Sequence, residues 1–120
     1  MSGPLPRLRK ICLALPEAYE QETWELPTFR VRAKIFAMFL AGSRGASRGD
    51  RPAVWLKAPP GAQAILVGAD ADRFFAPPYV GPKGWVGIFL DRRPDWAEVT
   101  LLVRRSYFLV APRKLAARLA

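Results

Sequence analysis

The chain has 120 residues, of which 51% are hydrophobic and 24% are charged, so we expect one domain, residues 1–120, around a single core. It contains no histidine and a single cysteine, Cys12, which excludes a Ser-His-Asp or Cys-His nucleophile and an internal disulfide. The net charge of +9 favours an anionic partner.

The apolar runs of the chain are short, and the longest of them is residues 35–41. A membrane-spanning helix needs about 20 apolar residues, so we expect no membrane segment. The N-terminal residues also lack an apolar core followed by a small-residue cleavage site. We therefore expect a cytoplasmic protein.

The first half of the chain predicts one helix and a set of strands. Apolar residues recur at helical spacing over residues 4–15, and Pro16 ends this helix. Residues 18–24 predict an edge strand, because glutamates interrupt them. Residues 28–31 and 34–40 predict a hairpin. Its connection Arg32-Ala33 lacks the glycine that primed turns favour, so we expect a longer turn or another type.

The second half adds two strands and several helices. A loop over residues 41–52 leads to a strand at 53–57, and a second apolar strand follows at 85–90. Short helices are predicted at 61–67 and at 70–75, the second with Asp70 as N-cap. The last two helices are expected at 94–109, with Asp95 and Glu98 in the first turn, and at 112–119.

Six short motifs follow one another along the chain. They begin with Leu-Pro-Glu at 15–17, Pro-Thr-Phe-Arg-Val at 27–31 and Trp-Leu-Lys at 55–57. The Pro/Gly-rich run at 75–87, Asp95-Trp96 and Ser106-Tyr107 complete the series. In this order the motifs resemble the MmcQ/YjbR family of small bacterial proteins. The resemblance implies an α+β fold of the CyaY-like, frataxin-like kind, in which helices pack on one face of an antiparallel sheet. It also implies DNA binding without a signature of catalysis.

Basic side chains gather in two parts of the sequence. Residues 30–57 hold seven of them against one acid, and residues 99–120 hold five and no acid. Such side chains would neutralise phosphates and release counterions, which gives sequence-tolerant and salt-sensitive binding. The other interpretation is a solvated surface that keeps the protein soluble. The candidate DNA contacts are Arg30, Arg32, Arg44, Arg48, Arg51, Lys57, Lys83, Arg104, Arg105, Arg113 and Lys114.

Aromatic residues alternate with aliphatic ones in two of the strands. Trp55 is expected to point away from Val54 and Leu56, and Trp85 and Phe89 away from Val86 and its neighbours. On an open face these rings would stack bases. The more ordinary interpretation is a minor packing cluster on the second face of the sheet.

Glutamates cluster at positions 17, 20, 22 and 25. Clustered carboxylates can bind hard cations, and frataxin-like proteins are associated with an acidic iron-binding ridge on their first helix. The corresponding helix here carries Arg7, Arg9 and Lys10 and no acid. We therefore predict a solvated edge strand, with no metal site and no cofactor.

Taken together, these features lead to a hypothesis of a non-enzymatic protein that binds DNA weakly through its backbone. The competing hypothesis is a protein-interaction or scaffold module with no nucleic-acid role. A third, a small-molecule binder or enzyme, requires a deep pocket lined by Tyr79, Trp85 and Asp91. The oligomeric state stays open.

Overall fold

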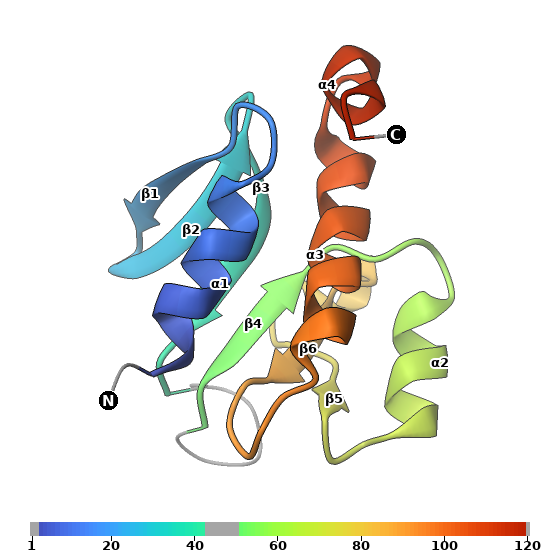
Figure 1. The fold of residues 1–120 in the computed structure, drawn as a ribbon. Helices are drawn as coiled ribbons and strands as arrows, with labels where there is room; N and C mark the ends of the chain where they lie inside the picture. Colours follow the sequence, from blue (N-terminus) through green and yellow to red (C-terminus); the bar gives the residue numbers. More distant parts are fainter. Residues whose placement is uncertain (1–2, 43–50, 120) are drawn as a thin grey trace.

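The computed structural model describes residues 3–42 and 51–119, and Figure 1 shows its helices and strands in chain order. None of the helices in these two ranges is long and apolar enough to cross a bilayer. The elements are α1 (Pro4–Leu13), β1 (Tyr19–Thr23), β2 (Leu26–Val31), β3 (Lys34–Leu40), β4 (Ala53–Leu56), α2 (Ala62–Ala69), β5 (Phe74–Phe75), the 3-10 helix η1 (Gly81–Lys83), β6 (Val86–Phe89), α3 (Trp96–Val110) and α4 (Arg113–Ala117).

The strands form one sheet in the order β1-β2-β3-β4-β6-β5, and every neighbouring pair is antiparallel. The predicted α+β class is therefore confirmed. β1 lies at one edge of the sheet, as its glutamates indicated. β5 lies at the other edge, where Phe74 pairs with Ile88.

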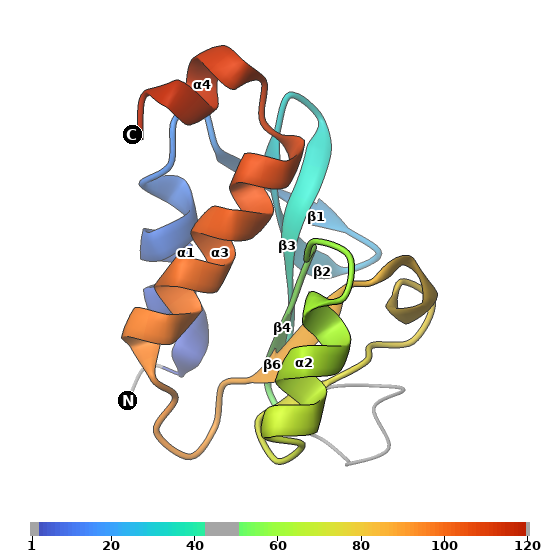
Figure 2. The ribbon, with the colours of Figure 1, turned by 90° about the vertical axis from the view of Figure 1, so that its right-hand side faces the viewer.

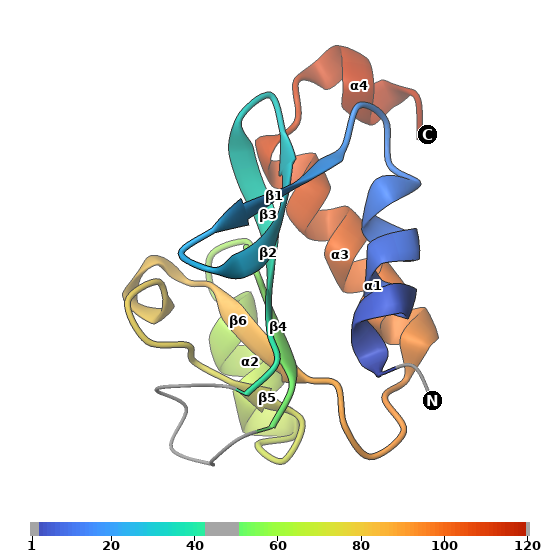
Figure 3. The same cartoon turned by 90° about the vertical axis from the view of Figure 1, so that its left-hand side faces the viewer.

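The first face of the sheet carries the main core. Apolar side chains that alternate along β4 and β6, among them Val54, Leu56, Val86 and Ile88, belong to this cluster. Figures 2 and 3 show α1 and α3 on the same side of the sheet, which confirms the prediction of helices on one face. These helices contribute Leu8, Cys12, Val99, Val103 and Tyr107 to the core.

Ser106 on α3 ties this helix to the sheet. Phe36 falls out of the β2–β3 register, which passes from Phe29↔Ala37 to Arg30↔Ile35, so β3 bulges at this residue. The buried Ser106 hydroxyl donates to the Phe36 carbonyl at 2.6 Å and accepts from the Lys57 amide at 2.9 Å. One side chain therefore satisfies a backbone group on β3 and another at the end of β4.

The second face of the sheet carries a smaller cluster. Met38, Leu40 and Trp55 are buried there, and Trp85 packs against them from the Pro/Gly-rich run. The predicted alternation is thus correct, because Trp55 lies opposite Val54 and Leu56. Gly87 makes this arrangement possible, since a Cβ built there would lie 2.2 Å from the ring of Phe75, which stacks on Phe89.

Two local predictions are wrong. No helix forms at 70–75: Asp70 ends α2, its carboxylate accepts from the Asp72 amide at 3.2 Å, and the chain turns into β5. An aspartate side chain that bonds its own backbone two residues on favours such a turn over a helix start. The Arg32-Ala33 connection is a two-residue turn with φ of 50° and 66°. Strand pairing up to Val31↔Lys34 imposes these angles without glycine.

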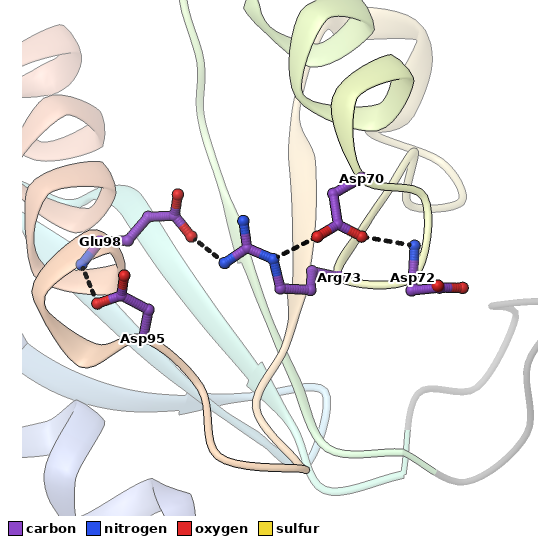
Figure 4. Close-up of polar contacts among 5 residues, drawn as sticks. All are labelled: Asp70, Asp72, Arg73, Asp95 and Glu98. Carbon is purple, nitrogen blue, oxygen red and sulfur yellow. Dashed lines mark hydrogen bonds and ion pairs between the residues drawn. The ribbon is translucent and has the colours of Figure 1, made fainter.

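Asp95, which was expected in the first turn, is the N-cap of α3 and accepts from the Glu98 amide at 3.2 Å. Figure 4 shows the Arg73 side chain between the carboxylates of Asp70 and Glu98. The Arg73–Glu98 ion pair therefore attaches the turn after α2 to the first turn of α3, and the Arg73–Asp70 pair lies within that turn.

Candidate functional site

The loop arginines can be followed only in part. Arg44 and Arg48 lie outside the described residues. Arg51 donates to both carboxylate oxygens of Asp91 at 2.8 Å, and its guanidinium lies 3.7 Å from the centre of the Phe89 ring. The hydrogen bonds from Arg51 hold the pKa of Asp91 below its usual value. Arg51 thus fastens β4 to the end of β6, and its charge is balanced.

The two hairpin arginines also have partners within the protein. Arg30 donates to the hydroxyls of Thr28 and Thr23 and to the Ala33 carbonyl, at 3.3, 2.9 and 3.2 Å. Arg32 pairs with Glu17 at 3.0 Å. Because Arg32 lies in the turn and β2 ends at Val31, the period-two alternation of the strand does not place Arg32 on the same face as Arg30.

The remaining predicted contacts, except Lys57 and Lys83, gather at one end of the molecule. The C-terminal end of α3, α4 and the β2–β3 turn lie at this end in Figures 1, 2 and 3. Lys57 follows β4, which ends nearer the middle of the molecule, and its amide donates to Ser106. We call the surface at this end the basic end and define it by six side chains, of which Lys34 and Arg118 were not among the candidates. They are Lys34, Arg104, Arg105, Arg113, Lys114 and Arg118.

The basic end has little internal charge compensation. Residues 99–119 contain no acid, and nearby Glu17 is occupied by Arg32. Arg104 donates to the Leu119 carbonyl at 3.5 Å. The Nε atom of Arg105 is buried and has no hydrogen-bond partner within the described ranges. This end therefore carries several positive charges, and the neighbouring acid Glu17 is already paired.

Lys83 lies elsewhere. It ends η1, within the Pro/Gly-rich run, and this run is on the side of the sheet opposite α1 and α3 (Figures 2 and 3). Lys83 and the basic end therefore cannot contact the same short stretch of a ligand.

The Pro/Gly-rich run forms one wall of a cavity on the second face of the sheet. Gln63 holds this wall by donating to the carbonyls of Gly81 and Trp85, and Gly84 turns the chain with φ of 91°. The cavity has a volume of about 810 Å³. Its lining residues are Trp24, Glu25, Leu26, Ile35, Met38, Leu40, Ala41, Gly42, Trp55, Tyr79, Val80 and Trp85.

This cavity answers the pocket hypothesis in part. Tyr79 and Trp85 line it together, but Asp91 is occupied by Arg51 at the end of β6. Sequence reasoning missed Trp24, which reaches the cavity from the β1–β2 turn. The signal in the sequence was Trp24 itself, a large aromatic residue beside Glu25. The connection that holds it is too short to bury such a side chain.

The glutamate cluster and Cys12 lie where the sequence places them. Glu20 on edge strand β1 accepts from Arg9 at 2.6 Å, and this hydrogen bond lowers its pKa. Cys12 is completely buried in the main core, and burial raises the pKa of its thiol. Within residues 3–42 and 51–119, no three carboxylate or cysteine side chains are grouped so as to hold a metal ion.

Comparisons with known proteins support the fold and the family. The chain matches no curated protein. It is similar to the crystal structure of Deinococcus radiodurans protein DR2400, which carries a DUF419 domain, with a TM-score of 0.74 and 22% identity over 96% of this chain and 86% of that one. The family model named YjbR matches residues 13–109. Since this match spans most of the sequence, the chain belongs to the YjbR family.

Proposed function

We propose that this protein binds double-stranded DNA weakly, without sequence preference and without catalysis, through phosphate contacts from the basic end. The observation that carries the proposal is that the elements bearing six basic side chains lie at one end, where the neighbouring acid Glu17 is already paired. Arginine and lysine bind phosphate oxygens and release condensed counterions from DNA. Contacts of this kind position a protein on DNA and carry no sequence information by themselves.

The structure changes which residues the proposal rests on. Arg51 and Arg32 have carboxylate partners, and Arg30 is held by three hydrogen bonds within the sheet. Releasing a paired arginine for a phosphate gives up its existing ion pair, so these side chains gain less than an unpaired one. The exposed side chains of α4, Arg113, Lys114 and Arg118, carry no such cost.

The experiment measures the fluorescence anisotropy of a fluorescein-labelled random duplex at salt concentrations from about 50 to about 200 mM. Binding should weaken log-linearly with salt. The triple variant R113A/K114A/R118A should bind more weakly, and the salt slope should fall by about 0.9 for each lost phosphate contact.

A matched control removes the same charge elsewhere. The variant K83A/R92A/R93A also loses three positive charges, from exposed positions outside the basic end. It should keep most of the affinity and most of the slope. Equal losses in the two variants would mean that net charge alone attracts DNA, and absence of binding at the lowest salt would reject the proposal.

A second candidate function, a protein-interaction module, has one observation in its favour. The outer side of α3 exposes Leu101 and Phe108, seven residues apart and therefore on the same side of the helix, together with Leu109. An apolar stripe of this kind is suited to bind another protein. This function predicts no salt-sensitive DNA binding. It also predicts that a partner protein is recovered in a pull-down with the unmodified protein and is lost with L101A/F108A.

A further inference from the structure

The cavity on the second face is built from three parts of the chain that are distant in sequence. Met38, Leu40 and Trp55 of the central strands form its floor. The β1–β2 turn contributes Trp24, and the Pro/Gly-rich run contributes Tyr79 and Trp85. A volume of about 810 Å³ falls within the range of small-molecule sites, which is roughly 300–1,000 Å³.

The four large aromatic side chains of this cavity make no ring–ring contacts within the described part of the chain. Ring–ring contacts in the described part of the chain join Phe36 with Tyr107, Phe75 with Phe89 and Tyr107 with Phe108. None of these contacts involves Trp24, Trp55, Tyr79 or Trp85. Trp55 and Trp85 pack within the smaller cluster, whereas the rings of Trp24 and Tyr79 are exposed and available to a planar occupant, which aromatic side chains hold by offset or edge-on stacking.

Two of the aromatic residues are displayed at the surface on a strained backbone. Trp24 and Tyr79 are 73% and 89% exposed, and their φ angles are 53° and 66°. Positive φ is unfavourable for residues with a Cβ and is maintained where the surrounding structure determines it. Because neither ring is held by burial, packing does not explain why a bulky residue occupies either position. Stacking on a ligand does.

Trp55 contributes an unused hydrogen-bond donor. Its side chain is 5% exposed, and its Nε1 atom is buried without a hydrogen-bond partner among the described residues. A buried donor without an acceptor is unfavourable. Trp55 is one of the residues that line the cavity, so the cavity lies beside this side chain. Because water does not reach the Nε1 atom, a ligand meets it only when a neighbouring side chain shifts.

The charge of the cavity restricts its ligand. Glu25 is the charged residue among the described lining residues, and no lysine or arginine joins it, although the whole chain carries +9. Phosphates and carboxylates therefore find no counterion among the described residues that line the cavity. The cavity is thus distinct from the basic end in position and in chemistry.

We propose that this cavity binds a planar aromatic small molecule, uncharged or cationic, that carries a hydrogen-bond acceptor on its ring. Trp24 and Tyr79 stack on the ligand at the mouth, Trp85 forms one wall, and Trp55 donates from the floor. This function is independent of DNA binding and uses the opposite face of the sheet from α1 and α3.

Quinoline and naphthalene form a matched pair of probes, since they share a shape and only quinoline has a ring-nitrogen acceptor. The readout is the set of four indole N–H signals in the ¹⁵N–¹H spectrum, assigned with single Trp→Phe variants. Trp96 is an internal control, because it lies under Arg7 and packs against the main core. Quinoline should shift the signals of Trp24, Trp55 and Trp85 in a saturable way and leave Trp96 unmoved.

The requirement for a hydrogen-bond acceptor on the ligand leads to a second, separate prediction. Quinoline should bind roughly fivefold more tightly than naphthalene, the factor that one neutral hydrogen bond supplies. W55F should remove this preference, and 2-naphthoate should bind more weakly than naphthalene. Equal binding of quinoline and naphthalene by the unmodified protein would overturn the role of Trp55.

Variants at the mouth keep the test valid even if W55F does not fold. W24A and Y79A change exposed side chains and should each weaken quinoline binding by at least about fivefold. F108A removes an exposed aromatic ring from α3 and should have no effect. Quinoline that moves none of the three signals, or moves Trp96 as much as the others, would overturn the proposal.

Discussion

Replacing Ser106 by alanine should destabilise the protein far more than the loss of one hydroxyl group suggests. The change removes the acceptor of the Lys57 amide and the donor to the Phe36 carbonyl. A buried group left without a partner costs about 1–3 kcal/mol. Lys57 is only half-buried, so water can compensate part of its loss. We therefore expect the free energy of unfolding to fall by about 2–4 kcal/mol.

Urea unfolding followed by circular dichroism measures this difference. With a slope of about 2 kcal/mol per molar urea, the midpoint should fall by about 1–2 M while the slope stays constant. T100A is the matched control, because Thr100 lies on the same helix and donates to the Trp96 carbonyl of its own helix at 2.7 Å. Its loss leaves no group of the sheet unpaired, so we expect a change below about 0.5 kcal/mol.

The reasoning is refuted if S106A and T100A lose similar stability. It is also refuted if S106A unfolds with an unchanged midpoint, because water would then replace both bonds. A decrease in the slope would point to a change in the unfolded state or to an intermediate.

Three further predictions concern stability and reactivity. A33G should stabilise the protein by about 1 kcal/mol in thermal unfolding, because Ala33 has a φ of 66° that glycine adopts without strain. A64G, on the exposed side of α2, should destabilise the protein by a similar amount, and effects of the same sign in the two variants would contradict this. Arg51 lowers the pKa of Asp91, so the stabilisation from this pair is present above about pH 4 and is lost as the pH falls through the lowered pKa. The difference in melting temperature between the unmodified protein and R51Q should therefore shrink on acidification, and a difference independent of pH would exclude the linkage. Cys12 is buried and the pKa of its thiol is raised, so it should react with Ellman's reagent at pH about 8 only after unfolding in urea. Rapid reaction of the folded protein would show that the core around α1 opens.

Hydrophobic periodicity in the sequence determined most of the architecture. The helical spacing of residues 4–15 reports which side chains of α1 are buried, whereas the alternation in β4 and β6, whose residues are all buried, reports the face of the sheet on which each side chain lies. The acids at the start of α3, Asp95 and Glu98, were also predictable, since negative charge near a helix N-terminus suits the helix dipole. The ordered motifs identified the family that the match over residues 13–109 shows.

Only the tertiary structure decided which charges and aromatic rings are available. Arg51 pairs with Asp91, 40 residues further along the chain, so the sequence of its loop could not show whether Arg51 is available to a phosphate. The Arg32-Ala33 turn was mispredicted because strand pairing outweighs the local preference of these residues. The cavity joins Trp24, Trp55 and Trp85 from separate elements. Local sequence determines burial through its period, whereas ion-pair partners and cavities depend on distances that exist only after the chain has folded.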